Sequence, residues 1–122
     1  MIMKILVCED DYMMTKAIGY KLSKDGYEVD LASDGNQASE KIRSNSYDII
    51  ITDLLMPYVG GLELINKIRN EMSLNTPIIV LSQLGNEETV LQAFKLGADD
   101  YVTKPFSPNE LSIRVKKLLI KR

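Results

Sequence analysis

The sequence predicts an α/β domain in which five parallel strands alternate with five helices. Short apolar segments and amphipathic segments follow one another along the chain, which is the pattern of a parallel sheet with right-handed crossovers. Two of the apolar segments, residues 49–52 and 77–81, lack the polar alternation of a half-exposed strand, so helices should cover both of their faces. Asp53 follows the first of these segments directly, where sheets of this kind bind their ligands.

The first half of the chain contains three predicted strands and two helices. The strands are expected at residues 3–8, 27–32 and 49–52. The first helix continues to about residue 24, where Asp25-Gly26 ends it, and its face at helical spacing consists of Met14, Ala17, Ile18, Lys21 and Leu22. The second helix, from residue 36 to about 44, should lie on the surface because its apolar stripe is only Ala38 and Ile42.

The second half supplies two strands and three helices. After Gly60-Gly61, a third helix is predicted with an apolar face of Leu62, Ile65, Ile68 and Met72. A strand at residues 77–81 precedes a helix from about 87 to 96, which Gly97 ends. The fifth strand covers residues 100–103, and the last helix starts with Ser107 as N-cap and Pro108 at its first position. The core face of that helix consists of Leu111, Val115, Leu118 and Leu119.

Composition limits the class of protein. At 122 residues with 45% hydrophobic residues, the chain is expected to form one domain, residues 1–122, with a core of its own. A net charge of -2 argues against direct binding to nucleic acid. The lone Cys8, with no signal peptide and no apolar stretch long enough for a membrane, favours a reducing, cytoplasmic location. The absence of histidine excludes histidine-based metal sites and catalytic triads within this chain.

Polar side chains follow four of the five predicted strands. Glu9 and Asp10 come after the first strand, Asp53 after the third, Ser82 after the fourth and Lys104 after the fifth. Each of them alone has an ordinary explanation as a helix cap or turn residue. The carboxyl ends of parallel strands share one edge, however, so we expect these side chains to converge.

This set of residues predicts phosphoryl transfer onto an aspartate. Carboxylates within a few ångströms of one another repel by roughly 4 kcal/mol per pair at an effective dielectric near 20, so a cation must offset them. Oxygen ligands without histidine or cysteine favour Mg²⁺. Asp53 would then be the nucleophile, Lys104 and the metal would neutralise the phosphoryl oxygens, and Ser82 would donate a hydrogen bond to the third oxygen.

The chain resembles a response-regulator receiver domain over essentially its whole length. The resemblance rests on the following motifs in this order: Glu9-Asp10, Asp53 with Met56-Pro57 and Gly60-Gly61, Ser82, Gly97-Ala98-Asp99-Asp100-Tyr101, and Lys104-Pro105-Phe106. It implies the doubly wound, flavodoxin-like sheet of order 2-1-3-4-5, flanked by five helices. It also implies that Asp53 accepts phosphate from the phosphohistidine of a sensor histidine kinase. The domain would be a regulatory phosphoacceptor that assists its own phosphorylation and dephosphorylation, not an enzyme.

The same resemblance assigns roles to individual residues. Asp10, Asp53 and the backbone carbonyl of Leu55 would ligate Mg²⁺, with Glu9 acting through water. Ser82 and Tyr101 would be the switch pair. Lys104 would contact the phosphate and precede a cis bond to Pro105.

Residues 98–108 are similar to the OmpR/PhoB subfamily, whose receivers precede a winged-helix DNA-binding domain. No such domain is present in the sequence, so the chain is either a fragment of a transcription factor or a stand-alone receiver. The subfamily implies a phosphorylation-favoured homodimer on the face made by the fourth helix, fifth strand and fifth helix. Asp100 of one chain would pair there with Arg114 of the other.

Two positions depart from the family pattern. Gln83 stands where the family usually has a small residue, and a longer amide there could narrow access to Asp53 or orient a hydrolytic water. The choice of phosphate donor and the lifetime of the phosphorylated state therefore do not follow from the resemblance. Val90 falls near the place where the family usually has a basic residue.

Other functions stay open. A degenerate receiver that only docks proteins is one alternative. A small Mg²⁺-dependent phosphatase of the haloacid dehalogenase type is another, although residues 8–12 do not match its motif. A flavin phosphate is disfavoured by the acidic first loop.

Overall fold

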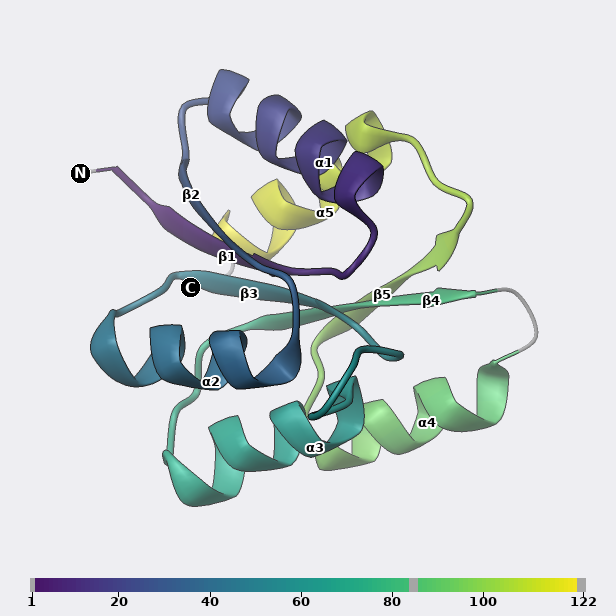
Figure 1. Cartoon of the computed structure of the whole chain (residues 1–122). Helices are drawn as coiled ribbons and strands as arrows, with labels where there is room; N and C mark the ends of the chain where they lie inside the picture. The colour runs from purple at the N-terminus through teal and green to yellow at the C-terminus, as the bar shows by residue number, and fades with distance from the viewer. Residues whose placement is uncertain (1, 84–85, 121–122) are drawn as a thin grey trace.

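The computed structural model describes residues 2–83 and 86–120, and they form the predicted five-stranded parallel sheet. The order of the strands is β2-β1-β3-β4-β5, which confirms the doubly wound order. Helices α1 and α5 cover one face of the sheet, and α2, α3 and α4 cover the other (Figure 1). The strands are β1 (Lys4–Cys8), β2 (Glu28–Ala32), β3 (Ile49–Asp53), β4 (Ile78–Gln83) and β5 (Asp100–Lys104). The helices are α1 (Tyr12–Lys24), α2 (Gly35–Ser44), α3 (Gly61–Asn66), α4 (Glu87–Leu96) and α5 (Pro108–Ile120).

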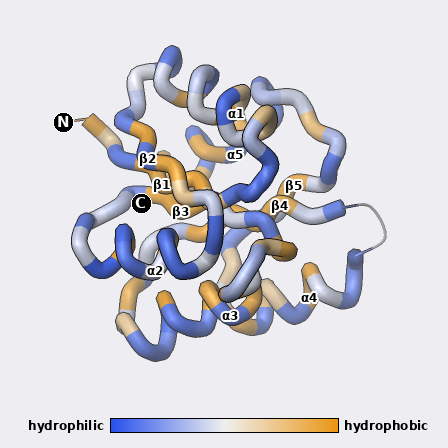
Figure 2. Tube along the Cα trace, in the orientation of Figure 1, coloured by the Kyte–Doolittle hydropathy of each residue, from blue (hydrophilic) through white to orange (hydrophobic). Residues whose placement is uncertain are grey.

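The central strand β3 is buried along its whole length, as its unbroken apolar sequence predicts. Ile49 and Ile51 pack into the core layer under α1 and α5, whereas Ile50 packs into the layer under α2, α3 and α4. Apolar residues accordingly lie along the inner strands, whereas polar and apolar residues alternate along the helices (Figure 2). Asp53 therefore stands at the carboxyl end of a strand that is buried along its whole length.

The third helix differs from the prediction in detail. The segment after α3 continues as a π-helical turn, η1 (Lys67–Glu71). The fully buried residues of this segment include Leu64 as well as Ile65 and Ile68, whereas Leu62 and Met72 are only partly buried. Leu62 and Met72 nevertheless pack against the core cluster that contains Ile65 and Ile68, so the predicted apolar face is confirmed. The π-helical turn itself was not predicted.

Caps and turns follow the sequence closely. Asp11 is the N-cap of α1, and its side chain accepts a hydrogen bond from the backbone N–H of Met14 at 3.1 Å. Helix capping thus accounts for Asp11, but not for Glu9 and Asp10, which also follow β1. Ser107 caps α5 in the same way, accepting from the N–H of Glu110 at 3.1 Å. Within the described part of the chain, none of the helices has the length and apolar character needed to cross a membrane.

Candidate functional site

Asp53 lies at the carboxyl end of β3, and its side chain is held by partners on two sides. The residue is 6% exposed. The ammonium Nζ of Lys104 lies 2.8 Å from Asp53 Oδ2, and the backbone N–H of Leu55 donates to Oδ1 at 3.3 Å. Lys104 reaches this position because β5 ends level with the tip of β4, where Lys104 is in register with Gln83. The peptide bond from Lys104 to Pro105 is cis, as the resemblance implied.

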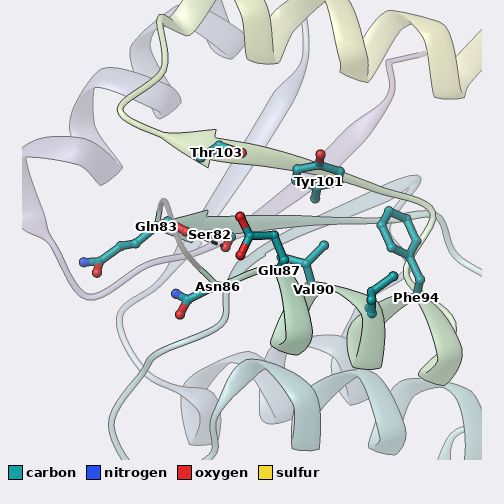
Figure 3. Close-up of a pocket in the computed structure, with 9 residues that line it drawn as sticks. Ser82, Gln83, Asn86, Glu87, Val90, Phe94, Tyr101 and Thr103 are labelled. Atoms are coloured by element: carbon teal, nitrogen blue, oxygen red, sulfur yellow. Dashed lines mark hydrogen bonds between the residues drawn. The ribbon is translucent and has the colours of Figure 1, made fainter.

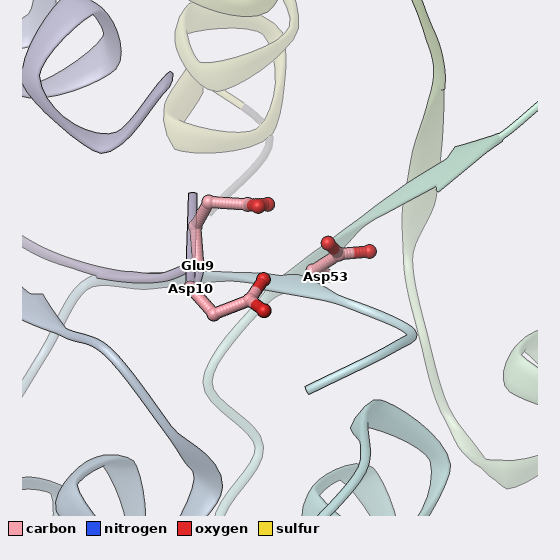
Figure 4. A group of neighbouring side chains, drawn as sticks. All are labelled: Glu9, Asp10 and Asp53. Atoms are coloured by element: carbon pink, nitrogen blue, oxygen red, sulfur yellow. The ribbon is translucent and has the colours of Figure 1, made fainter. Parts of the chain in front are cut away.

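Three carboxylates gather around this end of the sheet. Glu9, Asp10 and Asp53 each place one oxygen within 4.8 Å of the other two (Figure 4). Glu9 is 2% exposed, and its Oε2 lies 3.1 Å from the Lys104 ammonium, whereas Asp10 is exposed. The structure therefore brings together the two acids after β1, the acid after β3 and the lysine after β5, as the shared edge predicted.

Burial and charge shift the protonation equilibria of this cluster. Burial and the neighbouring Asp53 carboxylate together raise the pKa of Glu9 to about 7, against the opposing effect of Lys104. Burial alone would lower the pKa of the Lys104 ammonium. The hydrogen bonds and charges of Asp53 and Glu9 outweigh burial, so the pKa of Lys104 lies above its ordinary value. Lys104 is therefore a permanent cation of the cluster, but it is one positive charge for three acids.

The donor atoms of the cluster fit a hard divalent cation. All of them are carboxylate oxygens, which Mg²⁺ prefers, and an exposed acid leaves room for the water ligands that Mg²⁺ retains. Asp10 also lines an open hollow of about 360 Å³ together with Leu54, Leu55, Met56, Pro57 and Gly60. Leu55 is thus on the same solvent-accessible side of the cluster as Asp10.

A close approach of backbone shapes the loop beyond Asp53. A Cβ atom on Gly61 would lie 2.4 Å from the Asp53 carbonyl oxygen, whereas one on Gly60 would make an ordinary contact at 3.5 Å. Only the second glycine of the pair is therefore required by packing. A similar approach joins Gly35, at the start of α2, to Val59, since a Cβ there would lie 2.0 Å from the Val59 carbonyl oxygen. The sequence gives no sign of this second contact.

Ser82 on β4 and Tyr101 on β5 both line a cavity between these two strands and α4 (Figure 3). Ser82 is 2% exposed, and its hydroxyl donates to the Gln83 carbonyl at 3.1 Å. Tyr101 is 40% exposed and packs edge-on against Phe94. The cavity measures about 290 Å³, and its lining comprises Ser82, Gln83, Asn86, Glu87, Val90, Leu91, Phe94, Tyr101 and Thr103.

The two residues that depart from the family pattern lie at this cavity. The side chain of Gln83 is exposed and projects away from Ser82 (Figure 3). Val90, in place of a basic residue, is buried against the cavity. The sequence analysis did not find Phe94 and Thr103, because neither follows a strand directly nor belongs to a polar motif.

Asp100 and Arg114 form an ion pair within the single chain. Arg114 Nη1 lies 3.1 Å from both carboxylate oxygens of Asp100, and Arg114 Nη2 lies 3.4 Å from Glu110 Oε2. The two residues that the subfamily resemblance pairs between chains are therefore already paired in one copy.

The fold and the acid cluster define a doubly wound α/β domain with an aspartate, two further acids and a lysine at the carboxyl edge of its sheet. The family profile described as response regulator receiver domain matches residues 5–116. The chain belongs to this family. Members of the family are in general regulatory and non-enzymatic, bind Mg²⁺ at an acidic pocket and partner with sensor histidine kinases.

Individual relatives agree with this assignment. The chain is 40% identical over 116 residues to the transcriptional regulatory protein ResD of Bacillus subtilis, covering 95% of this chain and 48% of that protein. It is 39% identical over 116 residues to the alkaline phosphatase synthesis regulatory protein PhoP of the same organism, covering 95% of this chain and 48% of PhoP. These relatives are of the OmpR/PhoB type, and the chain spans about half the length of the curated relatives it matches.

Solved structures show the same fold. The receiver domain of the Francisella response regulator 1452 superposes with a TM-score of 0.90 at 41% identity, covering 97% of each chain. The chemotaxis response regulator CheY4 of Vibrio cholerae gives a TM-score of 0.91 at 29% identity, covering 98% of this chain and 100% of CheY4.

Proposed function

We propose that residues 1–122 form one receiver domain in which Asp53 accepts a phosphoryl group from the phosphohistidine of a sensor histidine kinase. The observation that carries this proposal is the contact of 2.8 Å between Asp53 Oδ2 and Lys104 Nζ at the buried end of β3. An Asp53 carboxylate oxygen forms the new O–P bond as the N–P bond of the donor breaks. The lone buried Cys8 and the kinase partner both suit a cytoplasmic location.

Each neighbour of Asp53 has a role in this transfer. Lys104 leaves its contact with Asp53 Oδ2 to pair with a phosphoryl oxygen, and the Ser82 hydroxyl exchanges its Gln83 carbonyl acceptor for another of these oxygens. Asp10, Asp53 and the Leu55 carbonyl would hold Mg²⁺, with Glu9 acting through water. The bound metal would supply the positive charge that offsets the oxygens of the incoming group.

The response to phosphorylation is a change in the face made by α4, β5 and α5. Ser82 moves toward the phosphoryl group, and Tyr101 turns into the space that this movement opens. The altered face favours a two-fold dimer, in which Asp100 of one chain exchanges its own Arg114 for that of the other. The output is transcription regulation, with DNA contacted by a winged-helix domain outside this sequence and not by this chain.

Phosphorylation at Asp53 is tested by intact-mass measurement after treatment with acetyl phosphate and Mg²⁺. The wild-type chain should gain the mass of one phosphoryl group. Asp53→Asn should gain none, because the amide is isosteric but is not a nucleophile. Asp34→Asn is the matched control, since Asp34 caps α2 and is not one of the three clustered acids. Undiminished labelling of Asp53→Asn would place the phosphate on another residue and contradict the assignment.

The dimer is tested by sedimentation of the protein with beryllofluoride, a phosphate mimic, and Mg²⁺. Arg114→Asp should favour the monomer, and adding Asp100→Arg should restore the dimer. Exposed ion pairs contribute only about 0.2 to 1 kcal/mol each, so these pairs set the register of the interface more than its affinity, and dimerisation should weaken as salt rises. A wild-type chain that stays monomeric with the mimic bound would leave signalling through a different protein partner as the better account.

A further inference from the structure

The ring of Tyr101 is held on the outer side of β5 by one aromatic neighbour. The rings of Phe94 and Tyr101 meet edge to face, with their centroids 5.8 Å apart and their planes at 83°. This is the geometry that aromatic pairs prefer. Phe94 comes from the last turn of α4, close to the Gly97 cap, and is 37% exposed.

An alternative place for the Tyr101 ring lies next to it. The cavity between α4 and the strands β4 and β5 measures about 290 Å³ and is lined by both Tyr101 and Ser82 (Figure 3). An apolar cavity of roughly 150 Å³ is enough to hold a benzene ring. The inner position therefore has room for an aromatic ring, and size alone does not keep Tyr101 outside.

We propose that Phe94 is a positioning residue that holds Tyr101 in its outer position and so sets the fraction of unphosphorylated protein in the active conformation. The proposal rests on the function proposed above, since it assumes that the inner position of Tyr101 accompanies phosphorylation of Asp53. Phe94 acts through Tyr101 and touches none of the reacting atoms. Its edge-to-face contact exists only while the tyrosine is outside, so the contact stabilises one of the two states selectively.

The size of the effect follows from the energy of an aromatic pair. Loss of the edge-to-face contact should change the ratio of outer to inner Tyr101 by about 2- to 13-fold. When a ligand binds only the minor conformation, its apparent affinity is proportional to the population of that conformation. The affinity for beryllofluoride with Mg²⁺ should therefore rise by the same factor when Phe94 is replaced by a non-aromatic residue.

The variants are Phe94→Leu and Phe94→Met, which keep apolar volume but remove the ring, and Phe94→Tyr, which keeps the ring. Leu91→Ala is the matched control, because Leu91 belongs to the same helix and lines the same cavity but is not an aromatic partner of Tyr101. Two quantities are measured on the whole chain. One, called the Tyr101 signal, is the NOE between the Tyr101 ring and the cavity-lining Val90 without metal or phosphate mimic, which reports the position of the ring and does not depend on the ring current of Phe94. The Tyr101 resonances are assigned with Tyr101→Phe, and the other quantity is the affinity for beryllofluoride in the presence of Mg²⁺.

The proposal expects Phe94→Leu and Phe94→Met to strengthen the Tyr101 signal and to bind beryllofluoride about 2- to 13-fold more tightly. Phe94→Tyr should restore wild-type values, and Leu91→Ala should stay within about twofold of wild type. An unchanged Tyr101 signal in both non-aromatic variants would overturn the proposal, as would an equal effect of Leu91→Ala. Failure of wild type to bind beryllofluoride would instead contradict the proposed function of Asp53, while the ring signal would still decide whether Phe94 holds Tyr101.

Discussion

Replacement of Glu9 by glutamine should change how the stability of the metal-free protein depends on pH. Burial and the neighbouring Asp53 carboxylate together raise the pKa of Glu9 from 4.5 to about 7 in the folded protein. A raised pKa means that the folded state binds the proton more tightly than the unfolded state does. The resulting stabilisation is complete below pH 4.5 or so and is lost as the pH rises through about 7. Glutamine has no ionisable carboxyl group, so the free energy of unfolding of Glu9→Gln should not decrease over this pH range in the way that of wild type does.

The size of the fall follows from the shift in pKa. Each unit corresponds to about 1.4 kcal/mol, which gives an upper figure of about 3 kcal/mol for Glu9. Relaxation of the cluster reduces this figure, so we expect wild type to lose about 1 to 3 kcal/mol between pH 5 and 8 relative to the variant. At pH 8 the glutamine variant should accordingly be the more stable protein. Mg²⁺ should narrow the difference, because a cation stabilises the ionised carboxylate.

The measurement is urea unfolding followed by circular dichroism from pH 5 to 8, at constant ionic strength and with a chelator. Glu40→Gln serves as the control, since Glu40 is exposed on α2, and its pH dependence should follow that of wild type. Parallel curves for wild type and Glu9→Gln would refute the reasoning. A glutamine variant that is less stable at every pH would show that the ion pair of Glu9 with Lys104 outweighs the cost of burying the carboxylate.

Other substitutions test the packing around the site and between helices. Gly61→Ala should destabilise the protein by about 1 to 3 kcal/mol in a thermal melt, because its Cβ would lie 2.4 Å from the Asp53 carbonyl oxygen. Gly19 lies within α1, and its Cβ would meet the Leu31 side chain of β2 at an ordinary 3.6 Å, so Gly19→Ala should instead be neutral or stabilising by up to about 1 kcal/mol. Equal losses of stability in both variants would argue against the close approach at Gly61. Ser112→Ala should raise the pKa of Asp25, which the Ser112 hydrogen bond holds below its usual range, in a carbon-13 NMR titration. A carboxyl group whose pKa is lower in the folded state than in the unfolded state stabilises the fold at a pH above its unfolded pKa. The Ser112→Ala variant should therefore be less stable than wild type at neutral pH, and the difference should shrink as acid protonates Asp25. An Asp25 pKa that is the same in both proteins would contradict this prediction.

The sequence was sufficient to predict the sheet and the convergence at its edge, because both depend on short-range patterns. Unbroken apolar segments identify β3 and β4 as inner strands, and parallel strands necessarily bring their carboxyl ends to one side. Asp53 and Lys104 could therefore be placed together although 51 positions separate them in the chain. The N-cap of α5 was equally predictable, because Ser107 and Pro108 act on neighbouring backbone groups.

Contacts that depend on how two elements meet could not be predicted. The edge-to-face pair of Phe94 and Tyr101 joins the last turn of α4 to β5, and no spacing rule relates the two positions. The requirement for Gly61 over Gly60 arises from the path of the loop after Asp53. The π-helical turn η1 likewise has no counterpart in apolar periodicity, so the change of helix type after Asn66 was not predicted.

The two ends of α4 are held differently, and this bears on how phosphorylation could reach the outer face. At the C-terminal end, the guanidinium of Arg69 donates to the Gly97 carbonyl at 2.9 and 3.2 Å and to Asp99 Oδ2 at 3.1 Å. Gly97 adopts a φ of 124° and lies so close to Arg69 that a Cβ would come within 2.8 Å of its Nε. At the N-terminal end, within the described residues, Asn86 makes no side-chain cap to the first turn. Any displacement of α4 should therefore be largest near Ser82 and smallest near Phe94, so that the aromatic contact is broken by rotation of Tyr101 and not by departure of its partner.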